Sequence, residues 1–254
     1  MTRMATQVPI PRRVEPLLRA IGGLADQRGM RAYAVGGCVR DWLLGLPIDT
    51  PDLDVTVEGD GIAVARAAGH ALGGTLTVHQ QFGTATQRLR RRADGGRPSG
   101  PLRVDFATCR RETYARPAAY PKIAAGTLKD DLFRRDFTVN AMAAALSPAR
   151  FGALVDPFHG ARDLEQRRLR VLHGRSFLDD PSRLLRGIRF AQRFGLRWEP
   201  LTRRAAEEAV AAGALGWLNA GRLRRELARM RGEPDPLACF EALAALLNSS
   251  VGAA

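Results

Sequence analysis

Apolar and polar residues alternate along five short stretches of the first half of the chain. The stretches are "RAYAVGG", "DLDVTVE", "TLTVHQ", "TATQRLR" and "LRVDFAT". Alternation of this kind is typical of half-buried β-strands. Residues 13–29, "CVRDWLLGL" and residues 62–72 instead show the spacing of amphipathic helices. A helix is also expected over residues 130–146, a loop over 109–129, and a basic hairpin tip at "RRADGGRPSG".

The pattern changes after Ser147 and Pro148, and from Gly160 onward it is almost wholly helical. The sequence therefore predicts an α+β fold class in two domains. Residues 1–147 would form a domain with a mixed β-sheet, and residues 148–254 an all-helical domain.

The charge of the chain points to a polyanionic partner. Its 254 residues are 45% apolar, which is enough for a hydrophobic core, and the formal net charge is +13. Such a surplus is typical of proteins that bind nucleic acid. Lys122 and Lys129 are the only lysines. A GC-rich genome would explain arginine in place of lysine, but not the excess of cations over acids.

The cysteines argue against a zinc site and for a reducing compartment. Cys38, Cys109 and Cys239 are scattered, and no C-x-x-C motif is present. This usage is expected of a cytoplasmic protein. No apolar run approaches the roughly 20 residues of a membrane span, and the N-terminus lacks the apolar region of a signal peptide. We expect no membrane partner.

Two carboxylates share one face of a predicted strand. Asp52 and Asp54 are two residues apart in "DLDVTVE", so their side chains point the same way. Taken alone, such a pair is more often a solvated strand end than a metal site. Asp105, on another predicted strand, favours the metal. Three carboxylates on adjacent strands would suit Mg²⁺, which prefers hard oxygen ligands and catalyses in-line displacement at phosphorus.

Two further stretches could hold phosphates. In "AVGGCVRDWLLG", Gly36 and Gly37 separate a predicted strand from a predicted helix, and Arg40 lies on the first helical turn. The backbone there could approach a phosphate, although a Gly-Gly turn alone is more often only a tight turn.

In "RRDFTVNAMA", two arginines precede an acid, with an amide one turn later. An exposed charged face is the ordinary interpretation of any single arginine there, but the apolar neighbours favour a buried Asp–Arg pair beside an Asn. The residues concerned are Arg134, Arg135, Asp136 and Asn140.

The stretch "LDDPSRLLRGIRFAQRFGL" predicts a polar stripe along one helix. Its residues step by three: Asp180, Arg183, Arg186 and Arg189. A carboxylate beside a guanidinium can accept from the exocyclic amine of cytosine or adenine and donate to the adjacent ring nitrogen. Uracil and guanine present the reverse order and would be rejected. For an isolated Asp-x-x-Arg, a simple i,i+3 salt bridge is the preferred interpretation.

These stretches occur in the order seen in one enzyme family. "GGCVRDWLLG", "DLDV", "RRDFTVNAMA", "VDPFHGARDLEQRRLRVL" and "DDPSRLLRGIRFAQRFGL" resemble the class II tRNA nucleotidyltransferases (CCA-adding enzymes) and bacterial poly(A) polymerases. The resemblance runs from about Tyr33 to Leu196. It implies a catalytic head with the nucleotidyltransferase fold over residues 1–147 and a helical neck over 148–254.

The resemblance also assigns roles. Asp52 and Asp54 would bind catalytic Mg²⁺, with Asp105 in the third acidic position. Gly36, Gly37 and Arg40 would hold the incoming triphosphate, near Arg134, Arg135 and Asn140. The template that selects CTP and ATP would consist of Asp180, Arg183, Arg186 and Arg189.

Two departures from the family pattern stand out. Asp179 replaces the usual Glu before the template Asp, and the chain ends at Ala254, so we expect the family's body and tail domains to be absent.

The implied reaction is the addition of C, A or both to the 3′ end of immature tRNA, with CTP and ATP as substrates and pyrophosphate as product. Alternatives are an enzyme that adds only CC or only the terminal A, a poly(A) polymerase, and an inactive RNA-binding protein. In this family the choice between C and A depends on the loop before "RRDF", here residues 109–129. Because this loop is present rather than deleted, we expect that the enzyme can add A.

Overall fold

The computed structural model describes residues 6–47, 52–89 and 102–249, which belong to two compact units. The first unit comprises residues 1–111, 124–133 and 140–161, and the second comprises 112–123, 134–139 and 162–254. The chain thus passes between the units several times. The domain boundary that we expect at residue 147, between a catalytic head and a helical neck, stays a prediction.

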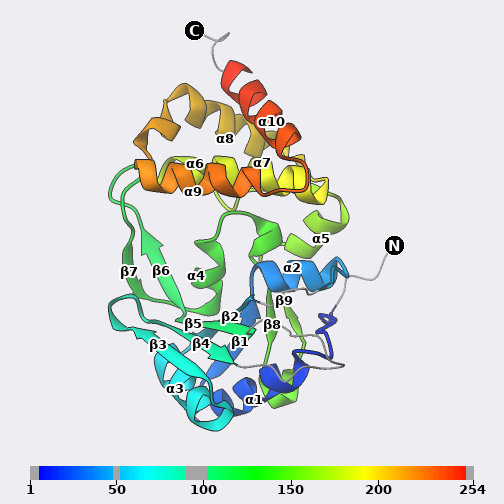
Figure 1. Ribbon diagram of the computed structural model, residues 1–254, viewed down its shortest axis with the longest axis vertical. Helices are drawn as coiled ribbons and strands as arrows, with labels where there is room; N and C mark the ends of the chain where they lie inside the picture. Colours follow the sequence, from blue (N-terminus) through cyan, green and yellow to red (C-terminus); the bar gives the residue numbers. More distant parts are fainter. Residues whose placement is uncertain (1–5, 48–51, 90–101, 250–254) are drawn as a thin grey trace. The chain divides into compact units, whose positions relative to one another are not determined.

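A mixed sheet forms the centre of the first unit (Figure 1). Its order is β3-β4-β5-β2-β1-β8-β9, and only the β2–β5 pair is parallel. The bounds are β1 (Arg31–Val35), β2 (Asp52–Glu58), β3 (Thr75–His79), β4 (Thr84–Leu89), β5 (Leu102–Thr108), β8 (Ala143–Ala145) and β9 (Leu154–Val155). The mixed β-sheet and the first five strands are as predicted.

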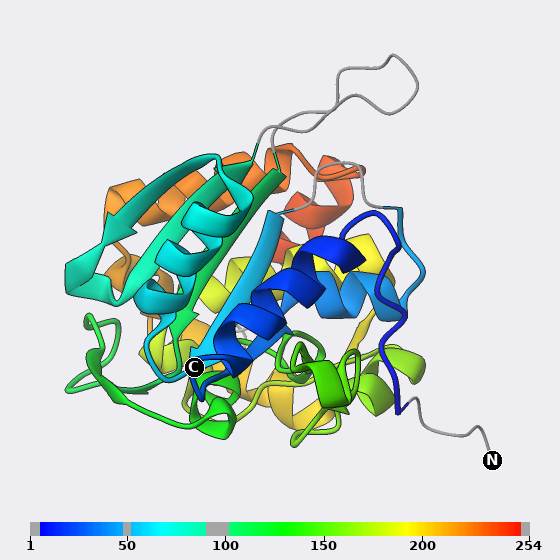
Figure 2. The same ribbon diagram turned by 90° about the horizontal axis from the view of Figure 1, so that it is seen from below.

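Helices α1 (Glu15–Asp26) and α3 (Gly61–Leu72) lie side by side on one face of this sheet (Figure 2). Leu53, Val55 and Val57 of β2 are buried, whereas Asp52 and Asp54 are exposed. Asp60 fixes the start of α3 by accepting hydrogen bonds from the backbone N–H groups of Ile62 and Ala63. The apolar face of the sheet is thereby covered, and the carboxylates lie on the opposite face.

Neighbouring glycines in α1 differ in the space around them. A Cβ at Gly22 would lie 1.8 Å from the carbonyl oxygen of Leu146, whereas a Cβ at Gly23 would meet nothing within 4 Å. Gly22→Ala should therefore lower the free energy of unfolding by about 3 kcal/mol, because backbone must move. Gly23→Ala should raise it by up to about 1 kcal/mol, from helix propensity alone. Urea denaturation of both variants checks this, and equal effects would contradict the packing described.

The prediction of a helix over residues 130–146 is wrong. Helix α4 (Leu128–Phe133) is short, and it is followed by a 3₁₀ turn, η2 (Thr138–Asn140), and by β8. All three residues of β8 are buried alanines, since the strand pairs with β1 on one side and β9 on the other. A fully buried strand has no alternation, so its apolar run cannot be told from a helix by periodicity.

The loop expected over residues 109–129 contains two strands, β6 (Arg110–Thr113) and β7 (Lys122–Ala125), which pair with each other. Every residue of β7 is exposed, and an exposed strand carries no apolar pattern to reveal it. The hairpin tip expected at "RRADGGRPSG" lies outside the described residues.

The second unit is mainly helical, as predicted from Gly160 onward. Its helices are α6 (Ser176–Asp179), α7 (Ser182–Phe194), α8 (Pro200–Ala211), α9 (Ala220–Arg231) and α10 (Pro236–Ser249); α5 (Gly160–Glu165) lies on the division between the units. Aromatic rings of Phe137, Phe177, Phe190 and Trp198 pack together in its core. A short parallel pair interrupts the helices: β10 (Arg168–Leu169) and β11 (Arg197–Trp198). Within the described ranges, none of the helices has the length and apolarity needed to cross a membrane.

Candidate active site

The strand β2 presents two carboxylates on the exposed face of the sheet. Asp52 and Asp54 are both exposed, while Leu53 between them is buried. The alternation of the strand produces this arrangement, because side chains at i and i+2 share a face. The sequence prediction of a same-face pair is confirmed.

Asp105 lies on the neighbouring parallel strand β5, opposite Asp54 in the register. Its carboxylate is already engaged. It accepts a hydrogen bond of 2.5 Å from Thr86 Oγ1 and forms an ion pair of 2.8 Å with Arg103. Among the described residues, no three His, Cys, Asp or Glu side chains form a group that could hold a metal ion. The structure therefore makes Asp105 the register partner of Asp54. It does not form the three-carboxylate group that the sequence predicted.

Two carboxylates alone still match the chemistry of Mg²⁺. This ion is commonly held by one or two carboxylates, with waters and substrate phosphates completing its coordination. Asp52 and Asp54 supply hard oxygen atoms on an accessible face. Within the described residues, this pair fits such an ion.

The turn after β1 holds the first predicted phosphate-binding stretch. Gly36 has φ 76°, a conformation that favours glycine, and α2 (Gly37–Leu43) begins directly after it. Arg40 is buried; its guanidinium donates to Asn140 Oδ1 at 2.6 Å and pairs with Asp41 at 2.7 Å. The fold thus brings Arg40 and Asn140 together from distant parts of the sequence and fixes the arginine in place.

Asp136 forms a buried ion pair in the second unit, but with an arginine of α7, which the expectation of a pair with Arg134 or Arg135 did not include. Arg186 Nη2 lies 2.6 Å from Asp136 Oδ2, and Asp136 is only 4% exposed. The Asp136 carboxylate raises the pKa of Arg186. Both predicted arginines before it, Arg134 and Arg135, are half-buried. Arg186 was predicted in the base-reading template, yet here its guanidinium neutralises Asp136.

Arg183 is held by backbone and hydroxyl oxygens. It is 4% exposed, and it donates to Ser176 Oγ at 2.7 Å and to the carbonyl oxygen of Arg134 at 2.7 Å. These bonds fix the plane of the guanidinium. A fixed donor is what recognition of a base edge requires.

Asp180 does not lie on the helix with Arg183, contrary to the prediction of one continuous stripe. Its backbone is extended (φ −140°, ψ 93°), and α7 begins at Ser182. The cause is Pro181, because a residue before proline is disfavoured in the helical region. The Asp180 carboxylate accepts from Ser182 Oγ at 2.6 Å and from Arg222 Nη2 at 2.6 Å.

Arg189, the last member of the predicted stripe, pairs with Glu233 at 2.8 Å and Glu226 at 3.3 Å. Arg193 pairs with the same Glu233 at 2.6 Å. These contacts tie α7 to α9 and to the segment after it. A structural role therefore accounts for Arg189.

Sequence reasoning missed the partners that orient the template. Tyr114 donates to Glu112 at 3.0 Å, and Glu112 pairs with Arg134 at 3.2 Å. Burial raises the pKa of Tyr114 to about 12, and the Glu112 carboxylate adds to the shift. Ser176 and Arg222 were missed as well. The contacts of Arg134, Ser176 and Arg222 leave no local signal, because each joins residues that are distant in the sequence or on separate elements.

The Asp136–Arg186 pair should matter for stability more than for base selection. Arg186→Gln leaves a buried carboxylate without its cation, and should lower the free energy of unfolding by about 2 kcal/mol. Preference among nucleotides should change less than threefold. Urea denaturation measures the change in stability, and nucleotide competition assays measure the change in preference. A stable variant with altered nucleotide preference would instead place Arg186 in the template.

Comparisons with known proteins all relate this chain to one enzyme family. The model of the poly A polymerase head domain matches residues 32–170. An A-adding tRNA nucleotidyltransferase of Halalkalibacterium halodurans is 41% identical over 229 residues, which are 89% of this chain and 51% of the relative. A CC-adding tRNA nucleotidyltransferase of Deinococcus radiodurans is 39% identical over 80% of this chain and 50% of the relative.

Solved structures agree with this assignment. A CCA-adding enzyme in an apo form is 42% identical, has a TM-score of 0.85, and is matched over 94% of this chain and 54% of that chain. The Thermotoga maritima CCA-adding enzyme complexed with tRNA is 41% identical, with a TM-score of 0.79 over 94% of this chain and 52% of the other. The present chain spans about half the length of these relatives. It belongs to the family defined by the poly A polymerase head domain.

Proposed function

We propose that this chain transfers a nucleotide from CTP or ATP to the 3′ end of an immature tRNA and releases pyrophosphate. The observation that carries the proposal is the exposed Asp52–Asp54 pair on β2 in a chain of this family. Its relatives are named A-adding and CC-adding tRNA nucleotidyltransferases, and related structures are titled as complexes with CTP, ATP and tRNA.

The reaction is an in-line displacement. The 3′-hydroxyl oxygen of the RNA loses its proton to solvent and bonds to the α-phosphorus. The bond from the α-phosphorus to the bridging oxygen of the β-phosphate breaks, and pyrophosphate leaves with the electron pair. Asp52 and Asp54 would hold Mg²⁺, which when bound neutralises phosphate charge and lowers the pKa of the attacking hydroxyl. Asp105, engaged by Thr86 and Arg103, would act by fixing β5 and its neighbour β4 beside the two carboxylates of β2.

The triphosphate needs cations and donors as well. The Gly36–Gly37 turn would let the backbone approach it, and Arg40 would neutralise it from a position fixed by Asn140. Because these groups are positioned before the substrate arrives, little reorganisation is needed on binding.

Base selection would rest on two residues. Asp180 would accept from the exocyclic amine of cytosine or adenine, and Arg183 would donate to the neighbouring ring nitrogen. Ser176 and the Arg134 carbonyl hold Arg183 for this task. Arg186 and Arg189 would support the template through their ion pairs with acids rather than contact the base.

Addition of the terminal A alone is the variant that the relatives favour. The first three similar curated proteins are all named A-adding enzymes, at 41%, 41% and 43% identity. CC-addition, complete CCA-addition and poly(A) synthesis are the alternatives. A cytoplasmic location would suit Cys38, Cys109 and Cys239, which form no disulfide among the described residues.

Three transcripts of one tRNA, ending at the discriminator base, at C and at CC, test the proposal. Each is incubated with Mg²⁺ and CTP, ATP or both, and products are resolved to single nucleotides. The expected result is addition of one A to the CC transcript. Growth of the shortest transcript to CCA would assign complete CCA-addition, and long A tails would assign poly(A) synthesis. No product with any transcript would overturn the proposal.

A further inference from the structure

Two arginines of the second unit lie directly opposite each other on paired strands. In the parallel β10–β11 pair, Arg168 is the register partner of Arg197, and Leu169 is the partner of Trp198. Register partners project from the same face, about 4.8 Å apart along the hydrogen-bonding direction. Leu169 is fully buried, whereas both arginines are exposed. We call Arg168 and Arg197 the arginine ladder.

The charge of the ladder is uncompensated within the described residues. No ion pair or side-chain hydrogen bond joins Arg168 or Arg197 to a carboxylate in that part of the chain. By contrast, Arg203, Arg204 and Arg229 on α8 and α9 are each paired with a glutamate. Like charges directly opposite each other on a sheet destabilise it. An arrangement that costs stability without an internal partner points to an external anion.

The ladder is held firmly by its own backbone. Arg197 N donates to Arg167 O at 2.8 Å, and Glu199 N donates to Leu169 O at 3.0 Å. Arg167 has φ 54°, rare for a residue with a Cβ, and its guanidinium donates to Phe194 O at 2.8 Å. The strained turn is thus fixed to the end of α7. The two exposed guanidinium groups project from a rigid support.

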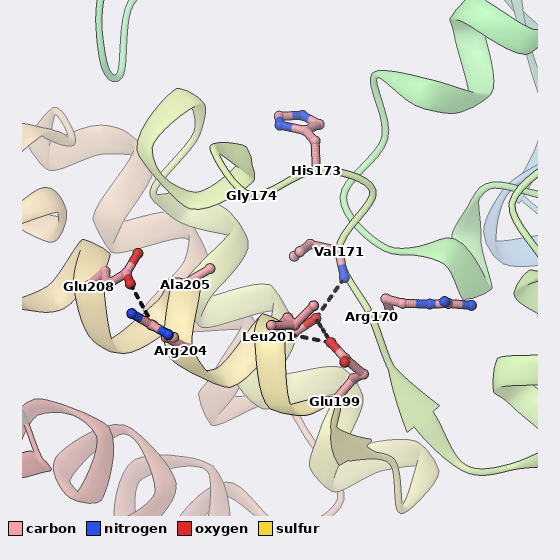
Figure 3. A pocket seen from close by; sticks show the side chains of 10 residues that line it. Arg170, Val171, His173, Gly174, Glu199, Leu201, Arg204, Ala205 and Glu208 are labelled. Carbon is pink, nitrogen blue, oxygen red and sulfur yellow. Dashed lines mark hydrogen bonds and ion pairs between the residues drawn. The ribbon is translucent and has the colours of Figure 1, made fainter.

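A pocket of about 500 Å³ begins where the ladder ends, lined by Arg170, Glu199 and residues of α8 (Figure 3). Its charges are satisfied internally. Arg170 pairs with Asp163 at 2.7 Å, and Arg204 pairs with Glu208 at 3.0 Å. Carboxylates and cations alternate around it, so the pocket itself is not built for an anion. The unpaired charge lies at the ladder.

We propose that Arg168 and Arg197 form a contact site for the phosphate backbone of the RNA substrate. The planar guanidinium suits phosphate, since it donates two parallel hydrogen bonds and keeps its charge at any physiological pH. This inference rests on the proposed function, because it takes the RNA to be the molecule that is extended.

An RNA backbone fits the ladder better than a small metabolite does. Small ligands are bound in concave sites that cover most of their surface, but both arginines are exposed on an open strand pair. A nucleic acid instead makes many shallow phosphate contacts, each adding to affinity through counterion release. The net charge of +13 agrees with such a partner.

The test compares Arg168→Gln/Arg197→Gln with a control that loses the same charge. The control is Arg19→Gln/Arg203→Gln, because both arginines are exposed and each is paired with a glutamate at i+4 or i−4. The dissociation constant for a tRNA transcript is measured by fluorescence anisotropy at several salt concentrations. The ladder variant should lower the slope of log Kd against log salt by about 1.4 to 1.8 more than the control, since each phosphate contact contributes about 0.7 to 0.9.

Further readouts separate a contact from a folding effect. The melting temperature of the ladder variant should not fall, because a like-charge pair is removed. Its KM for tRNA should rise while its KM for ATP and kcat stay unchanged. Arg168→Lys/Arg197→Lys should keep most of the affinity. Equal salt slopes for ladder and control variants would overturn the inference while leaving nucleotide transfer intact. If the wild type transfers no nucleotide but the ladder variant still binds the tRNA transcript more weakly, the proposed function is wrong. The inference that the arginine ladder contacts RNA is then still supported.

Discussion

Asp54→Asn should reduce nucleotide incorporation by about a thousandfold or more. Asp52 and Asp54 are the exposed same-face pair of β2, and the amide removes one of two negative charges from the proposed Mg²⁺ site. Loss of a single group that stabilises transition-state charge typically costs a factor of 10² to 10³, and loss of metal affinity adds to this. The measurement is single-turnover incorporation of labelled ATP into a CC-ending transcript.

The fold and RNA binding of Asp54→Asn should be preserved. Replacing one of two neighbouring carboxylates relieves repulsion, so the melting temperature should not fall. Asp26→Asn, an exposed acid at the end of α1, is the matched control and should retain full activity. Substantial incorporation by Asp54→Asn, at more than a tenth of the wild-type rate, would remove this carboxylate from the catalytic site.

Asp180→Ala should weaken discrimination among nucleotides. If the carboxylate accepts from the exocyclic amine, its loss removes one charge-assisted hydrogen bond, worth about 1.5–3 kcal/mol. The ratio of kcat/KM for ATP over GTP should then fall by about ten- to a hundredfold. Steady-state kinetics with each of the four nucleotides on one CC-ending transcript measures the ratio.

The contacts of Asp180 supply the control for that experiment. The carboxylate is bound by Ser182 and Arg222, so its removal could act through the start of α7 alone. Arg222→Gln breaks the same ion pair but leaves Asp180 in place. Arg222→Gln should keep its selectivity, whereas equal loss in both variants would show that Asp180 has a purely structural role.

The strands that carry the candidate site could be predicted because one face of each strand is more buried than the other. From Asp52 to Val55 of β2, exposed and buried side chains alternate, so the pattern predicted both the strand and the shared direction of the two carboxylates. Strand β8 shows no such difference, since Ala143 to Ala145 are buried together. Its alanines suit a helix by propensity, and pairing with β1 and β9 overrides that preference.

The roles of individual arginines could be predicted less well. Spacing placed Arg183, Arg186 and Arg189 on one helix, and α7 contains all three. Spacing could not show the partners of these arginines, because the partners come from other elements. They are an ion pair with Asp136 for Arg186, an ion pair with Glu233 for Arg189, and a hydrogen bond to a backbone carbonyl for Arg183. The extended backbone of Asp180 was predictable in principle from Pro181.

The most direct test of nucleotidyl transfer follows both ends of the triphosphate. The chain is incubated with Mg²⁺, a CC-ending tRNA transcript and ATP labelled either at the α- or at the γ-phosphate. The account predicts that α-label enters the RNA, that γ-label appears in pyrophosphate, and that the two amounts are equal. Entry of γ-label into the RNA, or release of phosphate without RNA extension, would contradict it.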